Sequence, residues 1–520
     1  MVGFSKINMN NQKDKVKIFD TTLRDGEQSA GAGLTKDEKL EIAKQLEILK
    51  VDVIEAGFAA SSPGDFDAVQ SIAKTIKNCE IASLARANPD DIDQGWAAIK
   101  NAINPRIHVF ISSSDIHILH QLRRNREQVV EMAVDMVKRA KKYCSNVEFS
   151  PMDATRTGND FLFLMLEEVI RAGATTVNIA DTVGYAIPSQ FSELIRNIKD
   201  KVEGIDDVTI SVHCHNDLGL ASSNSLAAVE AGARQVEGCI NGIGERAGNA
   251  ALEEVIIGLK SRKDHFGIQV NIDTKQLYPT SRLVSRLTGF NVQLNKAIVG
   301  GNAFRHASGI HQDGLLKERT TYELIDPVDV GWPGSSLVLG KLSGRSGLKS
   351  RLQDLGYVLD QEELNKIFAS FKNLADKKRE VTDRDLEALM SEEKRIAVEE
   401  VHFKLVDLTF NGGIDSTSVA KITLESKTQE RTTETAEGTG PVDAVCKAIR
   451  QAVGIEVKLV DYKVESITEG LDSLGDVTVR LEKDDNVYSG RGTSTDIVEA
   501  SALAYLAAIN RLCTIENIVN

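Results

Sequence analysis

VKIFDTTLRDGEQSAGAGLTKDEKLEIAKQLEILKVDVIEAG, residues 16–57, contains one complete strand–helix–strand unit. Its short apolar runs, Val16–Asp20 and Val51–Gly57, are typical of strands that are buried on both faces. Between them, Thr35-Lys-Asp-Glu38 is a capping box, which predicts the start of a helix. Two strands joined by a helix in this way are expected to pair in parallel through a right-handed crossover.

Units of the same kind follow one another up to residue 285. Asn88-Pro89 predicts another helix start, and further helices are expected over 125–143 and 219–231. Eight such units in about 250 residues match a closed (β/α)8 barrel, or TIM barrel, whereas a doubly wound open sheet seldom has eight uniform units. The fold class is therefore α/β, with a catalytic barrel over 1–288. The eight expected strands are Val16–Asp20, Val51–Gly57, Glu80–Arg86, Arg106–Ile111, Val147–Pro151, Thr176–Asp181, Thr209–His213 and Gln235–Ile240.

After residue 288 the sequence changes character. Glycine-rich segments separate short helices over 289–398, which predicts linker subdomains. Over 399–520 there is an internal repeat, in which Lys404-Leu-Val-Asp407 recurs as Lys458-Leu-Val-Asp461. Two β-rich units that each end in a helix are expected to form an α+β domain with a pseudo-twofold axis.

Each repeat contains a glycine pair that is expected to open its helix. Gly438 and Gly440 flank one threonine, and Gly490 and Gly492 flank one arginine. Backbone N–H groups at a helix N-terminus can bind an anionic ligand such as a carboxylate. Glycines at such positions also serve as simple helix caps, and the residues alone leave both interpretations open.

The composition limits the classes of partner. The chain has 62 Lys and Arg against 76 Asp and Glu, a formal net charge of −14, so nucleic acid is not an expected partner. The N-terminal residues lack the apolar segment of a secretory signal, and no uninterrupted apolar run approaches the ~18–20 residues that a membrane span needs. Six cysteines without CxxC pairs suit a reducing compartment. We therefore expect a cytoplasmic protein without a membrane partner.

Polar residues follow the expected strands where a barrel places its chemistry, at their carboxyl ends. His213 and His215 are two apart on a strand, so both imidazoles point the same way and the cysteine between them points to the opposite side. With the carboxylate of Asp25 and the amide oxygen of Asn249, they form a set that suits Mn²⁺, Zn²⁺, Fe²⁺ or Co²⁺. We predict a metal centre; the alternative is a histidine pair held only by hydrogen bonds.

Arg24 precedes the predicted carboxylate ligand. A guanidinium binds a carboxylate through two hydrogen bonds, and a divalent metal can bind a keto oxygen. A metal beside Arg24 therefore suits a 2-oxo acid substrate. The alternative role for Arg24 is a structural salt bridge to Asp20 or Glu55.

Three barrel motifs carry a family resemblance: FDTTLRDGEQ (19–28), HCHND (213–217) and GIGERAGN (242–249). They resemble the motifs of the 2-isopropylmalate synthase/homocitrate synthase family of barrel enzymes. The resemblance extends along nearly the whole chain and includes SGIHQDG (308–314) and GTGPVDA (438–444). The terminal domain is similar to the leucine-binding regulatory domain of 2-isopropylmalate synthases, which homocitrate synthases generally lack.

The resemblance implies an acyltransferase that condenses acetyl-CoA with 3-methyl-2-oxobutanoate to 2-isopropylmalate and CoA, the first committed step of leucine biosynthesis. Asp25, His213, His215 and Asn249 match the metal ligands of the family. Mn²⁺ is the expected ion, Mg²⁺, Zn²⁺ and Co²⁺ are alternatives, and K⁺ is a further candidate. Leucine is expected to bind between the terminal repeats, at the two glycine pairs, and to inhibit the enzyme.

The resemblance also implies roles for single residues. Arg24 matches the residue that stabilises developing charge on the oxo acid and enolate. His311 and Tyr322 match linker residues that complete the active site of the neighbouring subunit, which implies a homodimer. The base that enolises acetyl-CoA stays open, with His311 as a candidate. Residues that match the oxo-acid pocket are His108, Ser150 and Thr182.

Two positions depart from the family pattern. Met152 stands where many relatives have a glutamate in the oxo-acid pocket, so this chain lacks a charge there and gains apolar surface. We interpret this either as a changed side-chain preference or as neutral drift. Leu342 and Ser346 stand where many relatives have histidines, which counts against a catalytic role for that linker segment.

Three other functions remain to be weighed. A citramalate synthase would use pyruvate, and only the shape of the pocket separates it from an isopropylmalate synthase. A carbon–carbon lyase resembling hydroxymethylglutaryl-CoA lyase would share the barrel motifs, but the terminal repeat argues against it. A non-catalytic amino-acid sensor would have no reason to keep Arg24 together with the four metal-ligand residues.

Overall fold

The computed structural model describes residues 14–516, except for 334–337, 358, 377, 379–380, 394–401, 414–415, 467–474 and 485. The chain divides into two compact units, Met1–Arg305 with Glu323–Ser336, and His306–Tyr322 with Leu337–Asn520. The barrel lies in the first unit and the terminal domain in the second. The expected division into 1–288, 289–398 and 399–520 stays a prediction.

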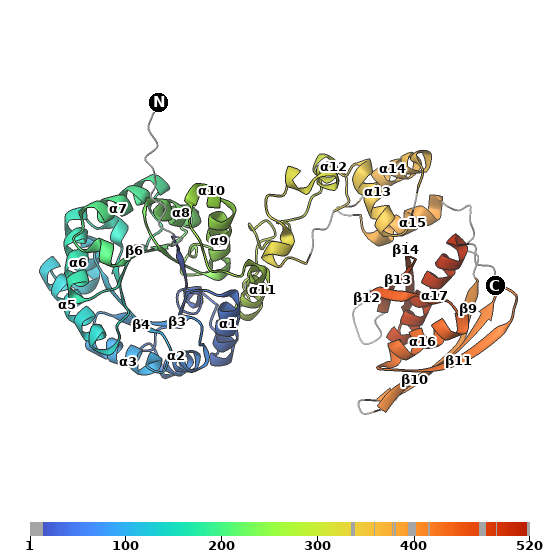
Figure 1. The fold of residues 1–520 in the computed structure, drawn as a ribbon, viewed down its shortest axis with the longest axis horizontal. Helices are drawn as coiled ribbons and strands as arrows, with labels where there is room; N and C mark the ends of the chain where they lie inside the picture. Colours follow the sequence, from blue (N-terminus) through green and yellow to red (C-terminus); the bar gives the residue numbers. More distant parts are fainter. Residues whose placement is uncertain are drawn as a thin grey trace. The chain divides into compact units, whose positions relative to one another are not determined.

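The first unit is a closed barrel of eight parallel strands in which each strand pairs with the next and the last pairs with the first (Figure 1). This closure confirms the predicted barrel over the doubly wound sheet. All eight expected strands form at the expected places. They are β1 (Lys17–Asp20), β2 (Val53–Glu55), β3 (Glu80–Arg86), β4 (Pro105–Ser112), β5 (Val147–Met152), β6 (Thr176–Asp181), β7 (Thr209–Cys214) and β8 (Gln235–Gly238).

Helices surround the barrel, and the expected caps begin several of them (Figure 1). The Thr35 hydroxyl accepts from the Glu38 N–H while the Glu38 carboxylate accepts from the Thr35 N–H, which confirms the capping box. Asn88 caps the helix that opens with Pro89. The helices are α1 (Lys36–Leu49), α2 (Pro63–Thr75), α3 (Pro89–Ile99), α4 (Asp115–His117), α5 (Arg126–Tyr143), α6 (Asn159–Ala172), α7 (Pro188–Lys201), α8 (Ala221–Ala231), α9 (Leu252–Ser261), α10 (Lys263–Phe266) and α11 (Leu277–Thr288).

The interior of the barrel is unusually polar below its mouth. Arg106 on β4 is 1% exposed and forms ion pairs with Glu148 on β5, at 2.9 Å, and with Glu80 on β3. Gln235 on β8 accepts from Arg106 and donates to Glu148. Because each buried charge has a hydrogen-bonded partner, this floor ties together opposite walls of the barrel beneath the site.

In the second unit, helices precede the terminal domain and pack against it. Helices α13, α14 and α15 share a small apolar core. The Ser489 hydroxyl donates to Glu387 of α15 at 3.3 Å, and Arg480 lies 3.7 Å from Asp383 of the same helix. The helices of this segment are α12 (Gly309–Lys317), α13 (Arg345–Asp354), α14 (Gln361–Ala375) and α15 (Asp383–Glu393).

The terminal domain consists of two strand–strand–strand–helix repeats, which confirms the internal repeat (Figure 1). Its last helix is long and apolar enough to cross a membrane by length and composition alone. That helix packs against the second sheet and belongs to the core that the two repeats share, as a core helix does. The first repeat has β9 (Phe403–Gly413), β10 (Ser416–Ser426), β11 (Arg431–Gly438) and α16 (Pro441–Val453); the second has β12 (Lys458–Ser466), β13 (Gly475–Lys483), β14 (Asn486–Ser494) and α17 (Ile497–Ile515).

The glycine pairs do not occupy equivalent positions. Gly438 ends β11 and Gly440 is the N-cap of α16, as expected. Gly490 and Gly492 lie inside β14, paired with Val479 and Val477 in the sheet, so the expected turn at the start of α17 is wrong for this pair. A role of these glycines in ligand binding stays a prediction.

We expect Gly490→Ala to destabilise the terminal domain. A Cβ at this position would lie 2.2 Å from the Ala504 carbonyl oxygen in α17, a backbone contact that only a shift of the helix can relieve. Overpacking of this kind costs about 1–3 kcal/mol or more. Gly440→Ala is the matched control, because a Cβ there meets open space and its φ of −162° suits any residue. Thermal unfolding measures the difference, and equal melting temperatures for the two variants would contradict the prediction.

Candidate active site

A cavity of about 250 Å³ opens at the carboxyl ends of the barrel strands. Its lining contains nearly every barrel residue that the sequence analysis singled out for chemistry. Because those residues lie on or directly after five different strands, barrel closure is what brings them together. The predicted residues that line it are Arg24, Asp25, His108, Ser150, Met152, Thr182, His213 and His215.

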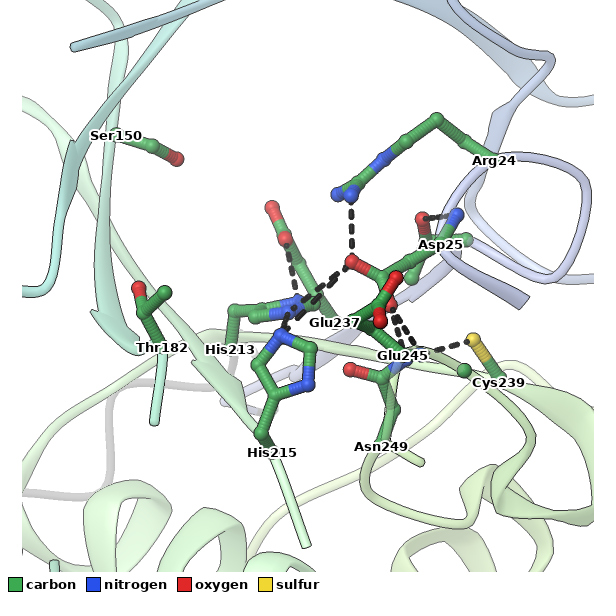
Figure 2. A network of polar contacts seen from close by, with 12 residues as sticks. Arg24, Asp25, Ser150, Thr182, His213, His215, Glu237, Cys239, Glu245 and Asn249 are labelled. Carbon is green, nitrogen blue, oxygen red and sulfur yellow. Dashed lines mark hydrogen bonds and ion pairs between the residues drawn. The ribbon is translucent and has the colours of Figure 1, made fainter. Parts of the chain in front are cut away.

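Three predicted metal ligands converge on one point (Figure 2). The Nε2 atoms of His213 and His215 are 3.2 Å apart, and Oδ2 of Asp25 lies 3.8 Å and 3.9 Å from them. The three side chains are buried, and their ligand atoms all lie within 4.8 Å of one another. This arrangement of two imidazoles and a carboxylate fits a divalent transition metal.

Asn249 presents its oxygen to the same point. Its amide nitrogen donates to Oδ1 of Asp25 at 2.7 Å and to the Ile243 carbonyl at 3.2 Å, whereas its buried oxygen has no hydrogen-bond donor among the described residues. Gly244 permits this packing, because a Cβ there would lie 2.1 Å from the Asn249 amide nitrogen. A buried oxygen without a hydrogen-bond donor, placed beside three converging ligands, is suited to be the fourth metal ligand.

The charges of the site suit a cation. Burial opposes ionisation of Asp25, but Arg24 and the two histidines outweigh it and hold the pKa of Asp25 well below its usual range. Burial lowers the pKa of both His213 and His215 to about 4. At neutral pH both rings are therefore uncharged and each has a lone pair to give to a metal. The intervening Cys214 is fully buried in the core of the barrel wall, as its position predicts.

Glu55 connects Arg24 to the oxo-acid side of the pocket. The sequence analysis named this residue only as a salt-bridge alternative, yet it accepts from Arg24 Nε at 2.6 Å and from His108 Nδ1 at 2.7 Å. Burial opposes its charge, but Arg24 and His108 lower the pKa of Glu55 to about 2. Arg24 also donates to Asp25 through Nη1 at 2.5 Å, so Nη2 is the nitrogen left without a described partner. The structural salt bridge and the site therefore use the same arginine.

The hydroxyl of Ser150 is oriented toward the pocket by two donors. Burial disfavours the charged form of His108, but Glu55 outweighs it and raises the pKa of His108 to about 9, so both ring nitrogens carry protons. His108 Nε2 lies 2.7 Å from Ser150 Oγ, and the Asn178 amide donates to the same oxygen at 2.8 Å. With both lone pairs occupied, Ser150 can only donate its own proton, and the pocket is where an acceptor can lie.

Thr182 is oriented in a similar way by Asp153, a residue that the sequence analysis missed. The Asp153 N–H donates to Thr182 Oγ1 at 2.8 Å. Asp153 is fully buried with a φ of +68°, and Ser114 and Arg156 hold its carboxylate. A buried non-glycine residue in the left-handed region is uncommon, and such residues cluster at functional sites. Its place directly after Met152 in the sequence is the signal that could have identified it.

Met152 lies in the pocket wall, which favours the interpretation as a specificity residue over neutral drift. It lines the cavity together with the apolar side chains of Leu84, Phe110 and Ala180. The cavity is therefore charged at Arg24 and apolar around Met152.

Family comparisons cover the chain in three consecutive matches. The HMGL-like family matches residues 15–284, the "homocitrate synthase post-HMGL domain-like" family matches 298–379, and the "LeuA allosteric (dimerisation) domain" family matches 380–513. Among solved structures, an HMG-CoA lyase from Acenitobacter baumannii in complex with coenzyme A and 3-methylmalate covers 56% of this chain and 97% of its own, with 23% identity and a TM-score of 0.47.

Curated relatives match over nearly the full length. A 2-isopropylmalate synthase of Ruminiclostridium cellulolyticum is 56% identical over 95% of this chain and 97% of the relative. Another 2-isopropylmalate synthase, from Dictyoglomus turgidum, is 54% identical over 96% of this chain and 98% of the relative. The chain belongs to the 2-isopropylmalate synthase family. The family resemblance drawn from the motifs is thereby confirmed, and so is the match of the terminal domain to an allosteric domain.

In this 2-isopropylmalate synthase family member, the two predicted linker residues lie together in the second unit. The rings of His311 and Tyr322 stack with centroids 4.0 Å apart and an interplanar angle of 23°. Leu342 and Ser346, the residues that depart from the family pattern, both contact α12. Ser346 donates to Asp313 at 2.8 Å, and the Leu342 carbonyl accepts from the N–H of the first residue of this helix. The catalytic roles of His311 and Tyr322 stay predictions.

Proposed function

We propose that the chain catalyses the condensation of acetyl-CoA with 3-methyl-2-oxobutanoate, followed by hydrolysis of the thioester by water, to give 2-isopropylmalate and CoA. One observation carries the proposal: three converging metal ligands, the Arg24 guanidinium and an apolar wall line one cavity at the barrel mouth. Asp25, His213, His215 and Asn249 would hold the metal, for which we propose Mn²⁺. A bound divalent ion would supply Lewis acidity to the keto oxygen of the oxo acid.

The protein residues bind and orient the oxo acid. Arg24 has Nη2 free to donate to the substrate carboxylate, while its bonds to Glu55 and Asp25 fix the plane of the guanidinium. The oriented hydroxyls of Ser150 and Thr182 donate to the substrate oxygens, on which negative charge develops in the transition state. The apolar side chains around Met152 accept the isopropyl group. We propose that His311 and Tyr322 from a second subunit of a homodimer take up the proton that leaves the methyl group of acetyl-CoA.

Release of free thiol from acetyl-CoA, measured with a panel of 2-oxo acids and with Mn²⁺ or Mg²⁺, tests the proposed function. We expect 3-methyl-2-oxobutanoate to give a higher kcat/KM than pyruvate, because each methyl group placed in an apolar pocket contributes about 1–3 kcal/mol of discrimination. A preference for pyruvate would move the assignment to citramalate synthase. Thiol release from acetyl-CoA with none of the oxo acids would refute it.

Thr182→Val is expected to raise the KM for the oxo acid about tenfold or more. Valine keeps the shape of the side chain but removes the hydroxyl, and a hydrogen bond to a charged group contributes about 1.5–3 kcal/mol. Thr182→Ser keeps the hydroxyl and is the matched control. Steady-state kinetics on both variants decide the matter: a KM for Thr182→Val equal to that of Thr182→Ser would show that the hydroxyl does not contact the substrate.

We propose that leucine binds between the two terminal repeats and lowers turnover. The support is the family of the terminal domain and the uncapped N-terminus of α16 at Gly440, which has no side-chain cap. Leucine is expected to inhibit thiol release by the full chain and to raise its melting temperature. A chain that ends near Ala388 and remains sensitive to leucine would overturn this part of the proposal.

A further inference from the structure

Glu237 and His213 are direct neighbours on adjacent strands. His213 pairs with Glu237 in the parallel register of β7 and β8, so their side chains leave the sheet side by side into the barrel. Oε2 of Glu237 lies 3.2 Å from Nδ1 of His213, the ring nitrogen that faces away from the point where the predicted metal ligands converge (Figure 2). The contact follows from strand register and not from a flexible loop.

Besides His213, the buried polar neighbours of the Glu237 carboxylate are Glu148 and His108. Glu237 is fully buried and lines the floor of the cavity, and neither of its oxygens accepts a hydrogen bond from a described donor. The His213 Nδ1 atom is equally buried and has no other partner. Since an unpaired buried carboxylate is costly, a fully buried one placed beside a metal ligand points to a function.

A second metal site at this carboxylate does not explain it. Ligand atoms of Glu237, Glu148 and His108 also lie within 4.8 Å of one another. Both ring nitrogens of His108, however, have partners at 2.7 Å, in Glu55 and Ser150. Glu148 in turn accepts from Arg106 and Gln235. His108 therefore has no lone pair for a metal, and the neighbour that Glu237 can serve is His213.

We propose that Glu237 is a positioning residue for the metal centre: it accepts the Nδ1 proton of His213 and so holds the Nε2 lone pair toward Asp25 and His215. The inference rests on the metal site of the proposed function. Which nitrogen of a ligand histidine carries the proton is set by the hydrogen bond that the other nitrogen makes. A carboxylate in this position also fixes the ring orientation and raises the basicity of the ligand. His215 has no such carboxylate in the described structure, so the two histidines are supported unequally.

Direct measurement of Mn²⁺ binding by electron paramagnetic resonance, without any substrate, tests the inference. Glu237→Met removes the acceptor at similar size and is expected to weaken Mn²⁺ binding about 10–100-fold, the usual effect of losing such a partner. Glu237→Gln keeps an acceptor oxygen without the charge and is expected to lose less. Asp91→Asn is the matched control, because it neutralises another buried carboxyl, one that is paired with Arg86 and contacts neither Glu237 nor the metal ligands in the described structure.

The visible spectrum of the Co²⁺-loaded protein gives a second readout that overall stability does not move. We expect Glu237→Met and Glu237→Gln to shift the d–d bands and Asp91→Asn to leave them unchanged. Wild-type affinity and spectrum in both Glu237 variants would overturn the inference, as would equal weakening in Asp91→Asn. If Glu237→Met does not fold, the spectrum of Glu237→Gln decides. Failure of the wild-type chain to bind Mn²⁺ or Co²⁺ would instead refute the metal site itself.

Discussion

His215→Ala is expected to lower kcat/KM for the condensation by about three orders of magnitude or more. The Nε2 atom of His215 is one of the converging ligand atoms, and the remaining three ligands would bind the ion weakly and leave an open position. Lewis-acid stabilisation is worth several kcal/mol, and each ~1.4 kcal/mol is a factor of ten in rate. The measurement is steady-state thiol release at saturating Mn²⁺.

His265→Ala is the matched control for this variant. His265 lies on the outside of the barrel, half exposed, and its ring is 3.4 Å from Glu230. We expect it to keep wild-type turnover, and we expect both variants to keep the wild-type circular dichroism spectrum. Turnover of His215→Ala equal to that of the control would show that the reaction does not need His215 as a metal ligand.

Arg24→Lys is expected to lower kcat/KM about a hundredfold. The guanidinium donates to Glu55 and Asp25 in fixed directions and still has Nη2 for the substrate, whereas an ammonium is a single point charge on a flexible stem. Loss of one charge-assisted hydrogen bond costs about 1.5–3 kcal/mol. The loss should be in kcat as well as in KM, because the role proposed for Arg24 is to stabilise charge that grows in the transition state.

Arg24→Ala separates the structural role of this side chain from the chemical one. It leaves the fully buried Glu55 carboxylate without its arginine, which is expected to lower the free energy of unfolding by about 3–5 kcal/mol. Urea denaturation measures this cost. Arg262→Ala, which removes an exposed arginine paired with Asp264, should change the unfolding midpoint very little. An unchanged midpoint in Arg24→Ala would show that Glu55 is not held by this ion pair.

Several features of the site could be predicted from local sequence alone. The spacing of His213 and His215 predicts two side chains on one face of a strand, because side chains alternate along a strand. The same alternation sends Cys214 into the wall, where the structure places it. Eight short apolar runs with helices between them predict the barrel, and barrels place their chemistry at the carboxyl ends of the strands.

Other features depend on contacts between residues that are far apart in the chain. Glu55 and Glu237 do not differ in local sequence from structural acidic residues, yet each contacts a residue of the site. Strand register decides which side chains become neighbours, and register is a property of two strands together. The same holds for Gly490, whose position against α17 makes it a packing residue inside a strand and not part of a turn.

The sequence by itself determined the number and order of the strand–helix units, the repeat in the terminal domain and the residue types of the metal site, because hydrophobic periodicity and side-chain alternation act over a few residues. Only the tertiary structure decided that β1 pairs with β8, which brings Asp25 beside Asn249 although the two are far apart in the sequence. It also decided the hydrogen bonds that leave the oxygen of Asn249 and Nη2 of Arg24 without a partner among the described residues. Those directions depend on which donors and acceptors barrel closure places within reach, and no local pattern encodes them.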